Sequence, residues 1–192
     1  MEDLRGDSWN MNQDEHKYTI EDIFALPDGV RAELFDGEMI MMSSPATIHQ
    51  RIVVRLLVEI ANKIRVRDGK CEVFASPGAV FLKDDGRNYV EPDLYVVCDR
   101  TKIDAKGCHG GPDWVIEVLS PSTKKLDYGK KLAAYIEAEV REYWVVDPEK
   151  RVIVVYSLEN PDMPQIHEFG DVIPVGIYED FDLDTAVIAD IE

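Results

Sequence analysis

The sequence lacks the features of membrane and secreted proteins. Its 192 residues contain no run of 18 or more apolar residues, which a transmembrane helix would need. The N-terminus, MEDLRGDSWN, is acidic and has neither the basic start nor the apolar block of a signal peptide. Internal repeats and low-complexity segments are also absent. We therefore expect a cytoplasmic protein that has no membrane partner.

Cysteine is scarce. Only Cys71, Cys98 and Cys108 occur, an odd number with no C-x-x-C spacing. Cytoplasmic proteins keep such thiols reduced, so we expect free, partly buried cysteines and no disulfide framework. A zinc site at Cys108-His109 would need a second pair of ligands at suitable spacing, which the sequence does not contain.

Positive charge is also in short supply. The chain has 21 Lys and Arg residues against 38 Asp and Glu residues, which gives a net charge of −17. Binding to a polyanion depends on Lys and Arg that neutralise phosphates, so this charge opposes a nucleic-acid partner. Only a local basic patch, or metal ions bound to clustered carboxylates, would offset it.

The composition is otherwise that of an ordinary globular domain, 45% hydrophobic and 31% charged. Residues 1–17 are polar and without periodicity, which indicates a flexible arm, and residues 18–192 are expected to form a single domain. The segment TIEDIFALP predicts a short helix capped by Thr19 and Asp22. The segment RAELFDGEMIMMS predicts a β-hairpin that turns at Asp36-Gly37.

Apolar residues then recur every four positions and predict an amphipathic helix over residues 46–67. These residues are Ile48, Ile52, Leu56, Ile60 and Ile64. Three strand-like segments follow, at 71–83, 89–97 and 113–120, separated by turns rich in Gly, Pro and Asp.

The second half of the chain alternates in type. Residues 122–140 predict a helix, and residues 141–159 predict two strands joined by a turn at Asp147-Pro148. A strand–helix–strand unit over residues 113–147 favours a parallel pair within a mixed sheet. The tail predicts small additional strands and an acidic end. The fold class is therefore α/β, a mixed β-sheet core flanked by helices, with an N-terminal helix and hairpin and additional C-terminal strands.

Two carboxylates interrupt the apolar strand patterns. Glu117 shares one face of its strand with Val115 and Leu119, and the other face is apolar as well. Asp93 follows Pro92 at the entrance to the apolar run LYVV. A buried ionised carboxylate is costly unless it is paired or bound to a cation.

A divalent cation would account for both acids. Mg²⁺ prefers oxygen ligands and often takes only one or two protein carboxylates, so Asp93 and Glu117 would suit it if they converge. The alternative for either acid is a place at the solvent edge, where it caps a loop or pairs with Arg.

The segment after Glu117, SPSTKKLDYGKKL, supplies a lysine. Asp127 and Lys131 are four residues apart on one helical face, with Tyr135 one turn further. Lys131 either forms a surface ion pair with Asp127 or points back over the acids. In the second position its ammonium would orient a water and stabilise charge that develops on a phosphate.

These residues resemble a known family. A PD dipeptide followed by an acid in the next strand is similar to the PD-(D/E)XK nuclease superfamily, which has the restriction-endonuclease-like fold. The set as a whole resembles the Uma-type family of bacterial restriction-endonuclease-like proteins, in matching order over about residues 18–158. The matching segments are ALPDGVRAELFDGEMIMMSSP, His49, EPDLYVV, VIEVLSPST, DYGKKLAAY and REYWVVDP.

The resemblance implies a restriction-endonuclease-like core and a Mg²⁺-dependent endonuclease, a hydrolase that acts on phosphodiester bonds. Mn²⁺ is expected to substitute for Mg²⁺, and DNA is the expected nucleic-acid substrate. In the superfamily, strand carboxylates hold the metal and a lysine two residues beyond the acid assists attack. That position here is Leu119, so the resemblance implies that the lysine has migrated to the following helix. Lys131 matches it, with Lys130 and Lys124 as weaker candidates.

The resemblance also implies roles for residues outside the two strands. It places Glu33 beside Asp93 and Glu117 as a third metal ligand, whereas the alternative is a hairpin charge that faces solvent. His49 would contact a phosphate or position water, or else be a structural or exposed histidine. Asp127 and Tyr135 are further supporting residues.

The sequence therefore leaves two functional hypotheses. The first is a nuclease in which Asp93, Glu117 and Lys131 are catalytic, working as a homodimer because two strands of a duplex need two sites. The second is a catalytically inactive nuclease-fold module for binding or oligomerisation. The net charge of −17 and the presence of Leu119 favour the second.

Overall fold

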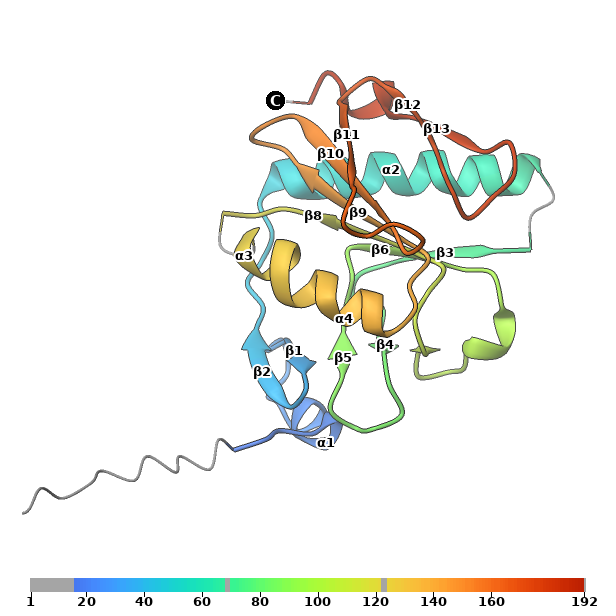
Figure 1. Cartoon of the computed structure of the whole chain (residues 1–192). Helices are drawn as coiled ribbons and strands as arrows, with labels where there is room; N and C mark the ends of the chain where they lie inside the picture. Colours follow the sequence, from blue (N-terminus) through green and yellow to red (C-terminus); the bar gives the residue numbers. More distant parts are fainter. Residues whose placement is uncertain (1–15, 68–69, 122–123, 192) are drawn as a thin grey trace, which may run out of the picture.

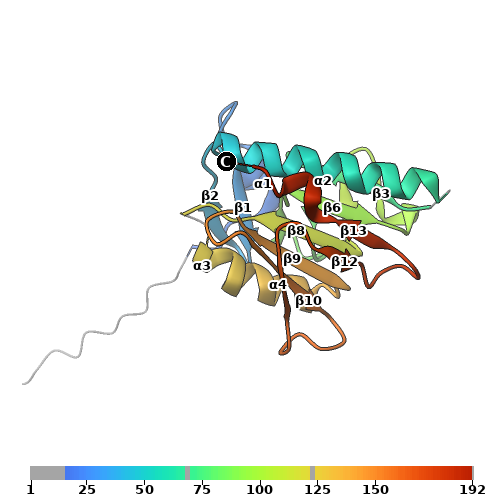
Figure 2. The ribbon, with the colours of Figure 1, turned by 90° about the horizontal axis from the view of Figure 1, so that it is seen from above.

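The computed structural model describes residues 16–67, 70–121 and 124–191. The arm predicted at residues 1–17 lies outside this part of the chain except for its last two residues. The described residues form two β-sheets and a separate pair of strands, with helices on both faces of the larger sheet (Figures 1 and 2). None of the described helices is long and apolar enough to cross a membrane.

In chain order the elements are α1 (Ile20–Phe24), β1 (Ala32–Phe35), β2 (Glu38–Met41), α2 (Thr47–Val66), β3 (Glu72–Ala75), β4 (Val80–Phe81), β5 (Tyr89–Val90), β6 (Leu94–Val97), the 3-10 turn η1 (Arg100–Lys102), β7 (Cys108–His109), β8 (Trp114–Val118), α3 (Lys124–Leu126), the π-helical turn η2 (Asp127–Lys131), α4 (Leu132–Glu137), β9 (Glu142–Asp147), β10 (Val152–Ser157), β11 (Gln165–Glu168), β12 (Val172–Pro174), β13 (Asp182–Asp184) and the 3-10 turn η3 (Thr185–Ile188).

The N-terminal elements follow the predicted capping and turn chemistry. Helix α1 begins after Thr19, whose backbone N–H donates to the Asp22 carboxylate over 2.8 Å. Strands β1 and β2 form the expected hairpin. Asp36 and Gly37 at its turn have φ angles of 50° and 80°, a region that an Asp-Gly pair tolerates.

Helix α2 buries most of its predicted apolar stripe. Ile52, Leu56, Ile60 and Ile64 are all buried, whereas Ile48 is half-buried at the first turn. The helix lies across one face of the larger sheet (Figures 1 and 2). Its N-terminal turn lies where β6 begins and β8 ends, because His49 contacts Asp93 there.

The larger sheet has six strands in the order β11-β10-β9-β8-β6-β3, and the smaller has five in the order β2-β1-β5-β4-β7. Strands β8 and β9 are parallel and are joined by α3, η2 and α4, which confirms the predicted strand–helix–strand unit. The other neighbours in the larger sheet are antiparallel. The sheet is therefore mixed, as the sequence predicts.

Two segments that the sequence predicts as single strands are instead divided between the sheets. Residues 71–83 form β3 and β4, and residues 89–97 form β5 and β6. Pro77 and Pro92 stand at the two crossings, and a proline cannot donate to a strand ladder. Asp93 directly follows the second crossing, so it lies at the corner where the two sheets meet.

Both faces of the larger sheet are buried. Trp114, Ile116 and Val118 of β8 pack into the core beneath α2, whereas Val115 and Leu119 pack into the core beneath η2 and α4. This alternation is the one that the sequence predicts. By alternation Glu117 lies on the second face, and it is buried there like its apolar neighbours.

The C-terminal segment completes the layer that contains α2. Ile173, Phe181, Leu183 and Ile188 are buried in the same core as α2. Strands β12 and β13 lie beside α2, while α3 and α4 lie on the opposite face of the larger sheet (Figures 1 and 2).

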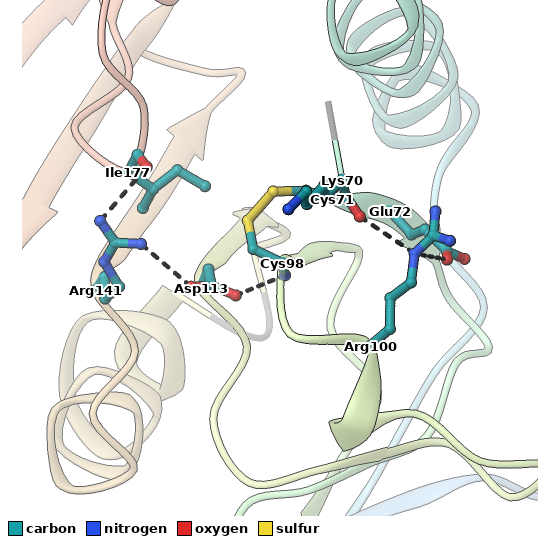
Figure 3. The surroundings of a disulfide bond; sticks show 8 residues. All are labelled: Lys70, Cys71, Glu72, Cys98, Arg100, Asp113, Arg141 and Ile177. Atoms are coloured by element: carbon teal, nitrogen blue, oxygen red, sulfur yellow. Dashed lines mark hydrogen bonds and ion pairs between the residues drawn. A yellow bond between two sulfur atoms is a disulfide. The ribbon is translucent and has the colours of Figure 1, made fainter. Parts of the chain in front are cut away.

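A disulfide bond joins Cys71 to Cys98, which overturns the expectation of free thiols for this pair (Figure 3). The ladder pairs Glu72 with Val97, so the two cysteines face each other at its next position. Strand pairing thus brings together thiols that are 27 residues apart in the sequence. Cys108 is free and buried, as expected.

Reduction of this disulfide should lower the free energy of unfolding by about 3 kcal/mol, because the bond closes a long loop in the unfolded chain. Urea denaturation with and without dithiothreitol measures the difference. The double variant Cys71→Ser/Cys98→Ser should match the reduced wild type and ignore the reductant. The variant Cys108→Ala should keep the full response, whereas an unchanged wild-type midpoint under reduction would show that the bond contributes nothing.

Candidate active site

The centre of the site is the ammonium of Lys131. Its Nζ lies 2.9 Å from Oε1 of Glu117, 3.1 Å from Oε2 of Glu33 and 3.7 Å from Oδ1 of Asp127. All four side chains are buried, and Lys131 itself is only 4% exposed. The surface ion pair considered for Asp127 and Lys131 is therefore wrong, and Lys131 points toward the acid-bearing strand.

The π-helical turn η2 contributes to this placement. Asp127 and Lys131 are its first and last residues, and both are buried together with Tyr135 of α4. The Tyr143 hydroxyl donates to the carbonyl of Asp127 over 3.1 Å, which gives a partner to a backbone group inside the turn. Short π-helical turns within α-helices recur at functional sites.

Asp93 and Glu117 come from neighbouring antiparallel strands. The ladder pairs Leu94 with Ile116, so one step further Asp93 stands opposite Glu117. Oδ2 of Asp93 accepts the backbone N–H of Val118 over 2.8 Å. The two acids therefore converge, as the sequence predicts for a cation site.

Two further side chains hold these acids in place. The Tyr135 hydroxyl donates to Oε1 of Glu117 over 2.7 Å. Nε2 of His49, in the first turn of α2, lies 3.0 Å from Oδ2 of Asp93. His49 is 7% exposed, so the alternative of an exposed histidine is wrong.

Electrostatics in this group are dominated by burial and by the excess of carboxylates. The pKa of Glu117 is raised to about 8, chiefly by burial; the Lys131 charge opposes this rise, and the charges of Asp93, Asp127 and Glu33 add to it. Burial lowers the pKa of Lys131, yet the carboxylates around it outweigh burial and hold the pKa well above its usual value. Burial and the Glu117 charge raise the pKa of Tyr135 in the same way, so its hydroxyl stays a donor.

Glu33 is fixed by a network that the sequence does not reveal. Its Oε1 accepts the backbone N–H of Glu91 over 3.1 Å, and the side chain is 2% exposed. The Glu91 carboxylate is held in turn by Arg31 and by the Tyr89 hydroxyl, which donates over 2.7 Å. The alternative of a solvent-facing Glu33 is therefore wrong. In the sequence, the only sign of this network is Glu91, the acid directly before Pro92 in EPDLYVV.

The weaker lysine candidates are engaged elsewhere. Lys130 pairs with Glu38 of β2, and Lys124 lies 3.1 Å from Asp147. Leu119, at the position where the superfamily has its lysine, is packed in the core. Among the described lysines, only Lys131 contacts the strand acid Glu117.

Two carboxylate oxygens in the site have no hydrogen-bond partner among the described residues. In the described part of the chain, Oδ1 of Asp93 and Oε2 of Glu117 accept no hydrogen bond, while the other oxygen of each side chain is occupied. No group of three or more Asp, Glu, His or Cys side chains within the described ranges is arranged to hold a metal ion. The arrangement thus suits a cation that takes two carboxylates and completes its shell with water and phosphate oxygens, as Mg²⁺ does.

The raised pKa of Glu117 predicts a specific pH dependence of stability. The folded chain keeps the Glu117 proton up to about pH 8, whereas the unfolded chain releases it near 4.5, so the folded state binds more protons between these values. The free energy of unfolding should therefore fall as the pH rises through this window. Urea denaturation at about pH 5, 6.5 and 8 should show a steeper fall for wild type than for Glu117→Gln. The exposed control Glu159→Gln should follow wild type; parallel curves for wild type and Glu117→Gln would contradict the prediction.

Loss of the Lys131 ammonium should strongly lower the stability of the fold. Lys131→Met leaves buried carboxylates without their cation and should lower the free energy of unfolding by about 3–5 kcal/mol at neutral pH. The exposed control Lys106→Met should change it little. Thermal or urea denaturation measures both, and equal stability of the two variants would show that Lys131 is not a structural cation.

Comparison with known proteins identifies the family of this chain. A family model described as "Putative restriction endonuclease" (Uma2) matches residues 20–186. An uncharacterized protein of Synechocystis sp., slr1290, is 34% identical over 103 residues, which are 54% of this chain and 53% of that protein. The chain thus matches about half the length of this curated relative.

A solved structure from Anabaena variabilis, described as a "putative nuclease belonging to DUF820", has the same fold. It aligns with a TM-score of 0.71 and 20% sequence identity, over 88% of this chain and 96% of that chain. The family model covers most of the sequence, including every residue of the Lys131 site. The chain therefore belongs to the Uma2 family of restriction-endonuclease-like proteins.

Proposed function

We propose that this protein is a Mg²⁺-dependent nuclease that hydrolyses phosphodiester bonds, with DNA as its substrate. The observation that carries the proposal is the single ammonium of Lys131 among buried carboxylates, with Asp93 opposite Glu117. Family membership supports the same class of reaction.

The excess of carboxylates supports the metal. Glu33, Glu117 and Asp127 contact one ammonium and Asp93 stands opposite Glu117, so the group has more negative than positive charge when all are ionised. Asp93 and Glu117 would hold Mg²⁺, or Mn²⁺ in its place, whereas Glu33, expected from the sequence as a third ligand, has both oxygens engaged by Lys131 and by the Glu91 backbone N–H. The cation would supply a Lewis acid for the phosphate and make a water more acidic.

The side chains of this chain would do the rest. Glu33 and Glu117 hold the Lys131 ammonium in place, and its positive charge would stabilise charge that develops on the phosphate oxygens. Tyr135 fixes Glu117, and His49 fixes Asp93, so that their second oxygens remain directed away from these partners. Such pre-positioned charge accounts for a large share of rate acceleration in many enzymes.

A catalytically inactive module for binding or oligomerisation is the second candidate. The net charge of −17 favours it, and so does the extent to which Lys131 is already paired. In that case the carboxylates and the lysine would serve only to join the two sheets. Metal binding and turnover distinguish the two functions.

A plasmid-nicking assay tests the enzyme. Wild type should nick supercoiled DNA with Mg²⁺ or Mn²⁺ and not with EDTA. Glu117→Gln and Asp93→Asn, which keep size and hydrogen bonding, should lose activity by about 100-fold or more, as expected when a group that stabilises transition-state charge is removed. The exposed controls Glu159→Gln and Asp162→Asn should keep it.

Three outcomes decide between the functions. Metal-dependent nicking that is lost only in the two site variants supports the nuclease. Equal nicking by all five proteins identifies a contaminant. Binding of Mn²⁺ can be followed by tryptophan fluorescence, because Trp114 lies on the strand that carries Glu117. A fluorescence change on Mn²⁺ addition without any nicking of DNA would support the inactive module.

The proposal includes a homodimer, because a duplex presents two strands to be cut. Light scattering at micromolar concentration measures the state of the protein, and a monomer under those conditions would remove this part. The nicking assay tests the proposed hydrolytic site separately from this part.

A further inference from the structure

The negative charge is unevenly distributed along the chain. Residues 159–192 contain ten of the 38 acidic residues and none of the 21 Lys and Arg residues, so they contribute −10 to the net charge of −17. Residues 18–158 contain 23 acidic and 19 basic residues, a difference of only −4. More than half of the net charge thus belongs to the C-terminal segment.

This acidic segment covers the cations of α2. Three of the basic side chains at or just beyond the helix donate to backbone carbonyls of the segment. These contacts join Arg55 to Val187 (2.8 Å), Lys63 to Asp182 (2.5 Å) and Arg67 to Glu179 (2.9 Å). Arg55 also pairs with the Asp190 carboxylate. The α2 face therefore presents carboxylates to solvent together with cations that are already engaged.

On the opposite face of the sheet, one segment is rich in positive charge. The eight residues 124–131, KKLDYGKK, contain four lysines, of which only Lys131 is buried. Lys124 and Lys130 are partly exposed, at 35% and 40% of their side chains, and each pairs with carboxylates. Lys125 is exposed and forms no ion pair with any described residue.

Position links these lysines to the site. Helix α3 follows the short loop after β8, the strand of Glu117, and continues through η2 to Lys131. Figures 1 and 2 place α3 and α4 on one face of the larger sheet, and α2 with β12 and β13 on the other. Lys125 is the one lysine of segment 124–131 with no ion pair to a described residue, so a polyanion that approaches Lys131 from the α3 side meets an unpaired positive charge.

We propose that nucleic acid reaches the site along α3 and η2, with Lys125 in contact with a backbone phosphate and the acidic C-terminal segment closing the α2 face to polyanions. The proposal rests on the proposed nuclease function, because it assigns a direction of approach to the same site. Lys124 and Lys130 flank this contact, where a phosphate would compete with Asp147 and Glu38 for their ammonium groups. The segment 124–131 is thus an interaction surface as well as the carrier of the buried lysine.

Binding without cleavage tests the direction of approach. Fluorescence anisotropy of a labelled DNA duplex, and of its single strand, is measured in EDTA at several salt concentrations. Lys125→Glu should weaken binding about tenfold near 0.1 M salt and lower the slope of log affinity against log salt by about one, as expected for one lost phosphate contact. Lys125→Arg should bind like wild type.

The matched control is Lys106→Glu, which makes the same change in net charge. Lys106 is exposed in the loop after η1, which lies at the far side of the molecule from α3 in both views (Figures 1 and 2). Its affinity should stay within about twofold of wild type, because exposed charges beyond about 10 Å are largely screened at this salt concentration. Neither lysine packs in the core, so both variants should unfold at the wild-type urea midpoint.

The outcomes separate this inference from the proposed function. Equal losses for Lys125→Glu and Lys106→Glu would show that only net charge matters, and unchanged binding by Lys125→Glu would place the substrate elsewhere; either result overturns the direction of approach while nicking by wild type continues. Wild-type protein that neither binds nor nicks DNA would overturn both. A selective loss for Lys125→Glu supports the surface even if turnover proves absent.

Discussion

One buried ion group joins parts of the molecule that are distant in the sequence. The Lys131 ammonium contacts Glu33 from the smaller sheet, Glu117 from the larger sheet and Asp127 from its own helix. A charge buried so completely is tolerated only when each of its donors meets an acceptor. The two sheets and the helix are therefore held in one relative position, because any shift would leave an ammonium or a carboxylate without a partner.

The same group works against the stability of the fold. Asp93 and Glu117 stand opposite each other on adjacent strands, an arrangement that like charges disfavour. Burial and the neighbouring acids raise the pKa of Glu117, so the cluster lowers its negative charge by keeping a proton. A cation bound between the acids would remove that need. An excess of buried acids is thus a cost to the fold and a source of affinity for a cation.

Local pattern predicted most of the elements, whereas long-range pairing decided the rest. The four-residue apolar repeat predicted α2, and the Asp36-Gly37 dipeptide predicted the turn of the hairpin. Alternation along β8 predicted which residues lie on each of its two faces. The sequence could not show that the strands at Pro77 and Pro92 cross between sheets, because each run is apolar on both sides of its proline. The Cys71–Cys98 bond and the link from Glu91 to Glu33 depend on the same pairings. Glu33 was undecided for this reason: β1 pairs with β5 as well as β2, which buries it.

The net charge was the strongest argument in the sequence against a nucleic-acid partner. That argument weakens when the positions of the charged residues in the structure are considered. A phosphate near Lys131 responds to charges within about a Debye length, roughly 8–10 Å at physiological salt, and much less to the total. The part of the acidic segment that contacts α2, residues 179–190, lies on the face opposite the lysines of residues 124–131. A total of −17 is therefore compatible with a locally cationic approach. Under the proposed direction of approach, the acidic segment would limit where a polyanion binds and would leave binding at the α3 side possible.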